Sequence, residues 1–173
     1  QYINYADNDT SLYKTNNSGS WNMYTISKTK IERNDYYWQT FTFQTSNVAS
    51  NPPSYLMVGL GNTTAWNTGY TNYYQIDYIF YIRDSSSTSY SRVFEANGSS
   101  YLPNNYTGYY NLAGTKTDND IYQIRVKGDV VQYLFNGSIV YTSTKTPTYP
   151  LYIKFNSEKS SSQSFVANTG IRN

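Results

Sequence analysis

Two tight-turn signals, Gly128-Asp129 and Asn136-Gly137, constrain this chain more than any other feature of its sequence. They separate three short runs of β-branched and aromatic residues in which apolar and polar positions alternate. Asn-Gly between such runs favours a type I′ turn, because that turn needs a positive φ at both central residues. The stretch therefore predicts three consecutive antiparallel strands: Ile121–Lys127, Val130–Phe135 and Ser138–Ser143.

The alternation also predicts which side chains of these strands are buried. One face of the first run carries Tyr122, Ile124 and Val126, and one face of the second carries Val131, Tyr133 and Phe135. A three-stranded meander cannot bury its apolar face alone, so the rest of the chain must supply a facing sheet.

The composition shows how a chain with few aliphatic residues can still form a core. Ile, Leu, Val and Phe number only 33 of 173 residues, which by itself is typical of disordered chains. Disordered chains, however, combine high net charge with few aromatic residues. This chain has a net charge of +2, 22 Tyr and 3 Trp. Since Tyr, Thr, Phe and Trp favour half-buried pleated surfaces, the composition predicts a β protein with an aromatic core.

Further alternating or apolar runs bring the total to about ten to twelve short strands, with little or no helix. The other main predicted strands are Trp21–Lys28, Tyr36–Thr45, Tyr55–Leu60, Tyr73–Arg83, Tyr90–Ala96, Pro150–Phe155 and Gln163–Asn168. In the longest, we expect an apolar face of Tyr74, Ile76, Tyr78, Phe80 and Ile82, opposite a mixed face. Many short strands with frequent turn signals are typical of an antiparallel β-sandwich or jelly roll.

The domain organisation is predicted to be simple. Residues 21–173 are expected to form a single β-sandwich domain, since no composition shift marks a boundary. Residues 1–20 are interpreted as a polar N-terminal arm or a peripheral strand, and such an arm could add a strand to a neighbouring copy. Because the chain begins at Gln1, we expect either a removed leader or a fragment of a longer protein.

The segment from Ile121 to Phe155 resembles the late strands of concanavalin A-like and laminin G-like sandwiches. The residues that carry the resemblance are GDVVQYLFNGSIVYTS followed by PLYIKF, with a strand, an Asn-Gly hairpin and a Val-Tyr strand in succession. The resemblance implies a concanavalin A-like jelly roll. That superfamily includes lectins, glycoside hydrolases, polysaccharide lyases and adhesion modules, so the fold alone does not choose an activity.

Several kinds of catalysis are disfavoured. The chain contains no Cys and no His, which excludes thiol catalysis, proton transfer by His and a zinc site built from the usual ligands. Retaining glycosidases need two carboxylates about 5 Å apart. Beyond the N-terminal third the only Glu residues are Glu95 and Glu158, and no predicted strand carries alternating acids. A lyase with a Tyr base stays open but usually needs a cationic partner. We therefore predict that the protein is not an enzyme.

No cofactor is expected, although one segment could hold calcium. Asp118 and Asp120 lie close together and offer the oxygen ligands that hard cations prefer. The alternative, which we favour, is a polar turn whose side chains cap backbone groups.

Aromatic residues next to polar ones are the best binding signal. Sugar rings stack on Tyr and Trp while amide, carboxylate and guanidinium groups bind their hydroxyls. The candidate glycan-binding residues are Trp38, Trp66, Tyr73, Gln75, Asp77, Tyr81 and Arg83. With 22 Tyr in the chain, however, any exposed face will contain several by count alone.

Six Asn-x-Ser/Thr sequons are candidate N-glycosylation sites: Asn8, Asn16, Asn62, Asn97, Asn105 and Asn136. This number is close to what chance gives at such an Asn, Ser and Thr content. Asn97 and Asn136 each precede Gly, so turn geometry also explains them.

Charge patterning and the lack of a catalytic set lead to two functional hypotheses. Scattered Lys and Arg give no footprint for nucleic acid, and no apolar run is long enough to insert into a membrane. The main hypothesis is a non-catalytic extracellular or cell-surface structural subunit, glycosylated, that assembles with copies of itself into a fibre or appendage. A viral jelly roll would share this pattern. The alternative is a lectin-like carbohydrate-binding module.

Overall fold

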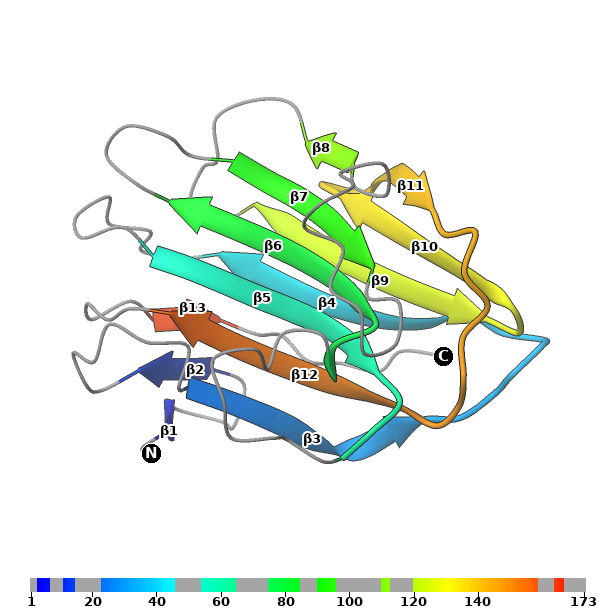
Figure 1. Ribbon diagram of the computed structural model, residues 1–173, viewed down its shortest axis with the longest axis horizontal. Coiled ribbons are helices and arrows are strands. Elements are labelled where there is room, and N and C mark those ends of the chain that lie inside the picture. Colours follow the sequence, from blue (N-terminus) through cyan, green and yellow to red (C-terminus); the bar gives the residue numbers. More distant parts are fainter. Residues whose placement is uncertain are drawn as a thin grey trace.

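The computed structural model of the chain is an antiparallel β-sandwich, with its two sheets lying one behind the other in Figure 1. It describes residues 3–6, 11–14, 23–45, 54–64, 75–84, 90–95, 110–112, 120–158 and 164–166. These ranges contain thirteen strands and no α-helix, which confirms the predicted all-β sandwich. Within them, no helix is long and apolar enough to span a bilayer.

One layer is a seven-stranded sheet in the order β1-β2-β13-β4-β9-β10-β11. Its strands are β1 (Ile3–Ala6), β2 (Ser11–Lys14), β4 (Gln39–Thr45), β9 (Ile121–Lys127), β10 (Val130–Phe135), β11 (Ser138–Thr142) and β13 (Ser164–Val166). Strands β1 and β2 lie at one end of this sheet, while the proposed division of the chain at residue 20 stays a prediction.

The other layer is a six-stranded sheet in the order β3-β12-β5-β6-β7-β8. Its strands are β3 (Met23–Ile31), β5 (Ser54–Gly61), β6 (Tyr78–Asp84), β7 (Tyr90–Glu95), β8 (Tyr110–Leu112) and β12 (Leu151–Glu158).

The predicted meander is confirmed as β9, β10 and β11, paired in sequence order. Asn136 and Gly137 have φ values of 48° and 81°, as a type I′ turn requires, and Gly128 has a φ of 53° in the preceding turn. Strand β4 pairs with the free side of β9 and continues the sheet. The predicted inward faces of β9 and β10 both contribute to the core.

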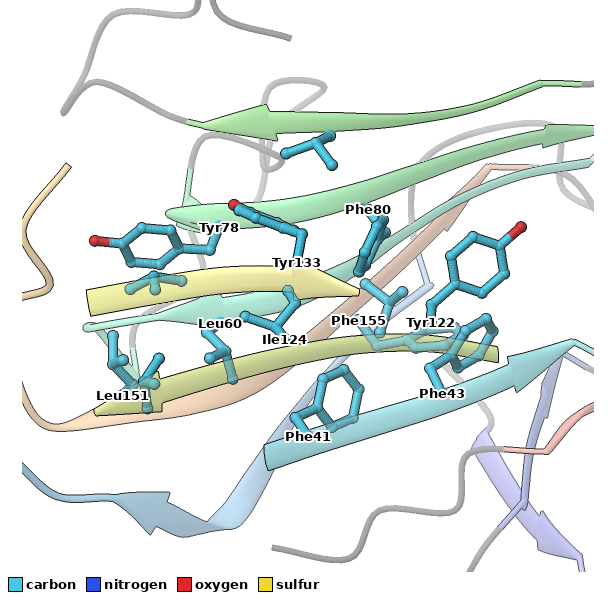
Figure 2. Close-up of a cluster of buried hydrophobic side chains, with 14 of the residues drawn as sticks. Phe41, Phe43, Leu60, Tyr78, Phe80, Tyr122, Ile124, Tyr133, Leu151 and Phe155 are labelled. Atoms are coloured by element: carbon cyan, nitrogen blue, oxygen red, sulfur yellow. The ribbon is translucent and has the colours of Figure 1, made fainter. Parts of the chain in front are cut away.

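Among the described residues, seven of the eighteen buried side chains in the core between the sheets are aromatic (Figure 2). The Phe80 ring of the six-stranded sheet packs edge-on against Tyr122 and Tyr133 of the seven-stranded sheet, with both centroid distances 5.2 Å. Tyr78, Tyr122 and Tyr133 are each at most 1% exposed. In Figure 2 the hydroxyl groups of Tyr78 and Tyr133 point toward one end of the sandwich and that of Tyr122 toward the other. Tyrosine therefore supplements the aliphatic residues of this core rather than replacing them.

The predicted strand Tyr36–Thr45 is wrong at its start, because β4 begins only at Gln39. The Asn34 side-chain oxygen accepts hydrogen bonds from the backbone N–H groups of Tyr36, at 2.8 Å, and Tyr37, at 3.1 Å. This turn competes with strand formation. It leaves Tyr36 83% and Tyr37 63% exposed.

The predicted strand Tyr73–Arg83 is also too long, because β6 begins at Tyr78. Before it, the Asp77 backbone N–H donates to the Leu60 carbonyl at 2.8 Å, so the chain turns there. Ile76 consequently does not share a face with Tyr78 and instead packs with Met57 and Ile79 on the other side of the sheet. Tyr73 and Tyr74 lie outside the described residues.

Candidate functional site

The candidate site is the outer face of the six-stranded sheet, which points away from the core. In β6, Tyr78, Phe80 and Ile82 belong to the core, so the alternating residues Tyr81 and Arg83 lie on the outer face. These two are the strand-borne members of the predicted glycan-binding set.

A continuous row of side chains crosses this face at right angles to the strands. Antiparallel register places Asn156 of β12 beside Met57 of β5, Met57 beside Tyr81 of β6, and Tyr81 beside Arg92 of β7. Directly paired residues share one face of a sheet, so these four side chains form a single line. We call Asn156, Met57, Tyr81 and Arg92 the transverse row.

An apolar platform lies beside the transverse row. Ile76 and Ile79 are buried with Met57 on this face, and the half-buried rings of Tyr81 and Phe94 pack against them. The two rings meet edge to face with centroids 5.4 Å apart. Since Met57, Ile76 and Ile79 have almost no exposed surface, only the two half-buried rings above them can contact a ligand.

The Asn156 carboxamide is the unusual member of the row. Asn156 is fully buried, and neither its side-chain oxygen nor its nitrogen has a hydrogen-bond partner among the described residues. Leaving a buried polar group unpaired costs about 1–3 kcal/mol, so native proteins rarely do so without reason. Because the carboxamide has no exposed surface, a ligand hydroxyl can bond to this oxygen and nitrogen only by displacing the groups that cover them.

Lys154 adds a charge to the same face two residues before Asn156. Its side chain is fully buried, and Nζ donates to the Gln75 carbonyl at 2.7 Å. Burial lowers the pKa of the Lys154 ammonium group to about 8, and the nearby Asp77 carboxylate only partly opposes this.

The lowered pKa of Lys154 should contribute a rise of about 2 kcal/mol in the free energy of unfolding between pH 8 and pH 10. Lys154 loses its proton in the folded state near pH 8, whereas the unfolded chain keeps it until its ordinary pKa of 10.5. The unfolded state therefore binds more protons across this window, and stability grows with pH. Urea unfolding at several pH values measures the slope. Lys154→Met should flatten it, and an unchanged slope in that variant would assign the effect to another group.

The other predicted glycan-binding residues do not all join this face. Both carboxylate oxygens of Asp77 bind within the chain: Oδ1 lies 3.2 Å from Lys145 Nζ, and Oδ2 accepts from the Asn62 backbone N–H at 2.9 Å. Asp77 thus holds the turn before β6. Trp38 lies beside Arg125 of the seven-stranded sheet. Trp66, like Tyr73, lies outside the described residues.

Asp120, one of the two predicted calcium ligands, has a structural partner. Its Oδ1 accepts a hydrogen bond from Asn136 Nδ2 at 3.1 Å, while Asn136 Oδ1 accepts from the Ile121 backbone N–H at 2.8 Å. These bonds tie the β10–β11 turn to the start of β9. The described residues contain no group of three potential metal-ligating side chains, and Asp118 is not among those residues.

Of the six sequons, two fall on described residues. Asn62 and Asn136 are both exposed, and the positive φ of Asn136 supports the turn explanation for that sequon. Asn8, Asn16, Asn97 and Asn105 lie outside the described residues. Glycosylation at all six stays a prediction.

The structure also reveals residues that the sequence did not single out. Extending the alternation of Leu151, Ile153 and Phe155 along β12 would have placed Lys154 and Asn156 on the opposite face. No pattern in the sequence indicates that the Glu95 side chain is partly buried. Burial raises the pKa of the Glu95 carboxyl, against the opposing effects of Ser143 and Lys145.

Comparisons with solved structures identify the fold. No protein-family model matches the chain, and no curated protein matches it in sequence. The Emp46p carbohydrate recognition domain in its metal-free form is similar, with a TM-score of 0.62, 10% identity, and coverage of 95% of this chain and 82% of that one. The SPRY domain of human HERC1 has a TM-score of 0.60, 11% identity, and coverage of 100% and 96%.

A transglycosylase, Crh5 in complex with NAG, is also similar, with a TM-score of 0.51, 10% identity, and coverage of 91% of this chain and 56% of that one. At such identities the likeness concerns the fold. The chain has a concanavalin A-like β-sandwich, the architecture shared by these lectin, SPRY and glycosidase-like structures.

Proposed function

We propose that the protein is a lectin-like carbohydrate-binding module whose ligand lies on the outer face of the six-stranded sheet. The observation that carries the proposal is the transverse row, with the fully buried and unpartnered carboxamide of Asn156 at one end. The similarity to a domain described as a carbohydrate recognition domain supports the same function.

The chemistry of this face suits a sugar. The rings of Tyr81 and Phe94 offer apolar surface for the C–H face of a pyranose, and the apolar platform holds them in place. The guanidinium group of Arg92 offers hydrogen bonds to ring hydroxyls on one side, and Asn156 does so on the other side once the groups that cover its carboxamide are displaced.

Binding without catalysis is the proposed mode of action. Retaining glycosidases use two carboxylates placed about 5 Å apart. The transverse row contains an amide, a thioether, a phenol and a guanidinium group, and Asp77 is engaged by Lys145 and Asn62. The self-assembling structural subunit, the extracellular location and the glycosylation remain predictions from the sequence, and the comparisons favour the lectin-like alternative.

Replacing Asn156 with Leu should abolish glycan binding while it raises the free energy of unfolding by roughly 1–3 kcal/mol. Leu has a similar volume and removes two buried polar atoms that have no partner among the described residues. A glycan array identifies a neutral ligand for the wild-type protein, and calorimetry then compares the affinities. Urea unfolding gives the stability change.

Because the variant is expected to be more stable, lost binding could not be attributed to unfolding. Gln123→Leu is the matched control: it removes an amide that bonds Thr42 on the outer face of the other sheet, and it should leave neutral-glycan binding intact. If Asn156→Leu binds the glycan as well as the wild-type protein does, or if the array shows no ligand, the proposal is wrong.

A further inference from the structure

A second polar surface lies on the outer face of the seven-stranded sheet. Ile124 and Val126 of β9 are buried in the core, so Arg125 and Lys127 lie on the outer face, about 7 Å apart along the strand. Trp38, which immediately precedes β4, lies beside them. We call Trp38, Arg125 and Lys127 the basic-aromatic patch.

The guanidinium group of Arg125 is held rigidly. Its Nε and Nη2 both donate to Gln132 Oε1, at 2.9 and 2.7 Å, and its Cζ lies 4.4 Å from the centre of the Trp38 ring. Gln132 is fixed in turn, because its Nε2 donates to Thr142 Oγ1 at 3.3 Å. An arginine that is already ordered loses less conformational freedom when it binds an anion.

The described residues supply no carboxylate for the two cations of the patch. Elsewhere on the surface, cations are matched with acids: Lys30 pairs with Glu32, and Arg33 pairs with Asp129. Neither Arg125 nor Lys127 forms an ion pair with a described residue. Of the five N–H donors of a guanidinium group, the bonds to Gln132 use two, and Nη1 has no described partner.

We propose that the basic-aromatic patch is a binding site for the carboxylate or sulfate groups of an acidic polysaccharide. The Nη1 edge of Arg125 binds an anionic oxygen, Lys127 binds a second anionic group, and Trp38 lines the site. This site is independent of the glycan-binding face proposed above, since it lies on the opposite sheet.

The surroundings favour an acidic glycan over other polyanions. The rows beside the patch consist of amides and hydroxyls, including the bonded pair Gln123 and Thr42, which suit the hydroxyl groups of a sugar chain. Nucleic-acid surfaces instead cluster many cations on one face, whereas Lys and Arg are scattered along this sequence.

Polygalacturonate and its fully methyl-esterified form are the matched probes, because they share a backbone and differ in charge. The wild-type protein should bind polygalacturonate, measured by calorimetry, and should bind the ester at least about tenfold more weakly. Arg125→Gln should weaken polygalacturonate binding at least about tenfold, and Lys127→Gln several-fold. Raising the ionic strength from about 0.05 to 0.5 M should weaken it as well.

Lys30→Gln is the control for net charge, since it removes the same charge from an existing ion pair and should change the affinity less than about twofold. Arg125→Lys keeps the charge but loses the planar contact with Trp38 and should bind more weakly than the wild-type protein. Thermal unfolding of each variant checks that the fold is retained.

The outcomes separate this site from the proposed neutral-glycan face. Asn156→Leu should leave polygalacturonate binding unchanged. If Asn156→Leu abolishes that binding and Arg125→Gln does not, the second site is wrong while the first function stands. Equal binding of poly-glutamate or single-stranded DNA would also overturn the inference, because it would show adsorption by charge alone. Equal binding of the methyl ester would have the same consequence.

Discussion

Above pH 10 the free energy of unfolding should fall by roughly 4 kcal/mol for each pH unit. Burial raises the pKa values of Tyr78, Tyr122 and Tyr133 well above the usual 10, because the phenolate form is poorly solvated between the sheets. In the unfolded chain the same groups ionise near pH 10. The folded state then binds more protons, so each tyrosine removes about 1.4 kcal/mol of stability per pH unit.

A domain of ordinary stability, about 5–15 kcal/mol, should therefore unfold cooperatively between about pH 11 and pH 13. Ultraviolet absorbance of tyrosinate and circular dichroism follow the two events in one titration. The three buried tyrosines should ionise only as the sheet signal disappears.

Tyr133→Phe isolates the contribution of one group. Its hydroxyl donates a long hydrogen bond, 3.4 Å, to the Phe94 carbonyl and also bonds the Glu95 side chain, so the substitution should cost about 1–2 kcal/mol at neutral pH. It should reduce the alkaline slope by about a third. Ionisation of all the tyrosines near pH 10 with the sheet signal intact would contradict the explanation.

Gly59→Ala should destabilise the protein by at least about 3 kcal/mol or prevent folding. A Cβ atom at position 59 would lie 1.8 Å from the Tyr78 carbonyl oxygen and 2.8 Å from its carbon. Both are backbone atoms of the adjacent strand, so the β5–β6 ladder would have to open. Ile76 Cγ2, at 3.0 Å, blocks the remaining space on the outer face.

Gly137→Ala is the matched control, because a Cβ there meets nothing within 4 Å. Its φ of +81° still disfavours alanine, which should cost about 1–2 kcal/mol. Urea unfolding of the two variants separates steric overlap from backbone strain. If Gly59→Ala is no more destabilised than Gly137→Ala, the predicted steric overlap of a Cβ at position 59 with Tyr78 and Ile76 is wrong.

The meander was predictable because its information is local. Turn types depend on the φ values that Asn136, Gly137 and Gly128 can adopt, and the face of each side chain follows from the period of two. The predicted starts of two other strands were wrong, because a hydrogen bond from a nearby side chain or a distant strand replaced the extended backbone there. The Asn34 side chain bonds the backbone of Tyr36 and Tyr37, and the Leu60 carbonyl bonds Asp77, so alternation stops in both places.

The candidate site was only partly predictable, for a different reason. Tyr81 and Arg83 could be placed on one face because they belong to one strand. The transverse row depends on the register between β12, β5, β6 and β7, and β12 lies about 70 residues beyond β6 in the chain. No local pattern specifies which residues of distant strands face each other, so Asn156 could not be assigned to the same row as Tyr81.

An all-β chain with several buried aromatic residues, the three strands from Ile121 onward and their two turns could be predicted, because they depend on composition, alternation and local φ preferences. Which polar groups are buried and which are paired could be learned from the folded structure alone. In the folded chain Asn156 and Lys154 are fully buried, and Asp77 forms an ion pair with Lys145. Arg125 bonds Gln132 and has no carboxylate partner among the described residues. Burial and pairing depend on contacts between distant segments, and these contacts separate a binding surface from an ordinary polar one.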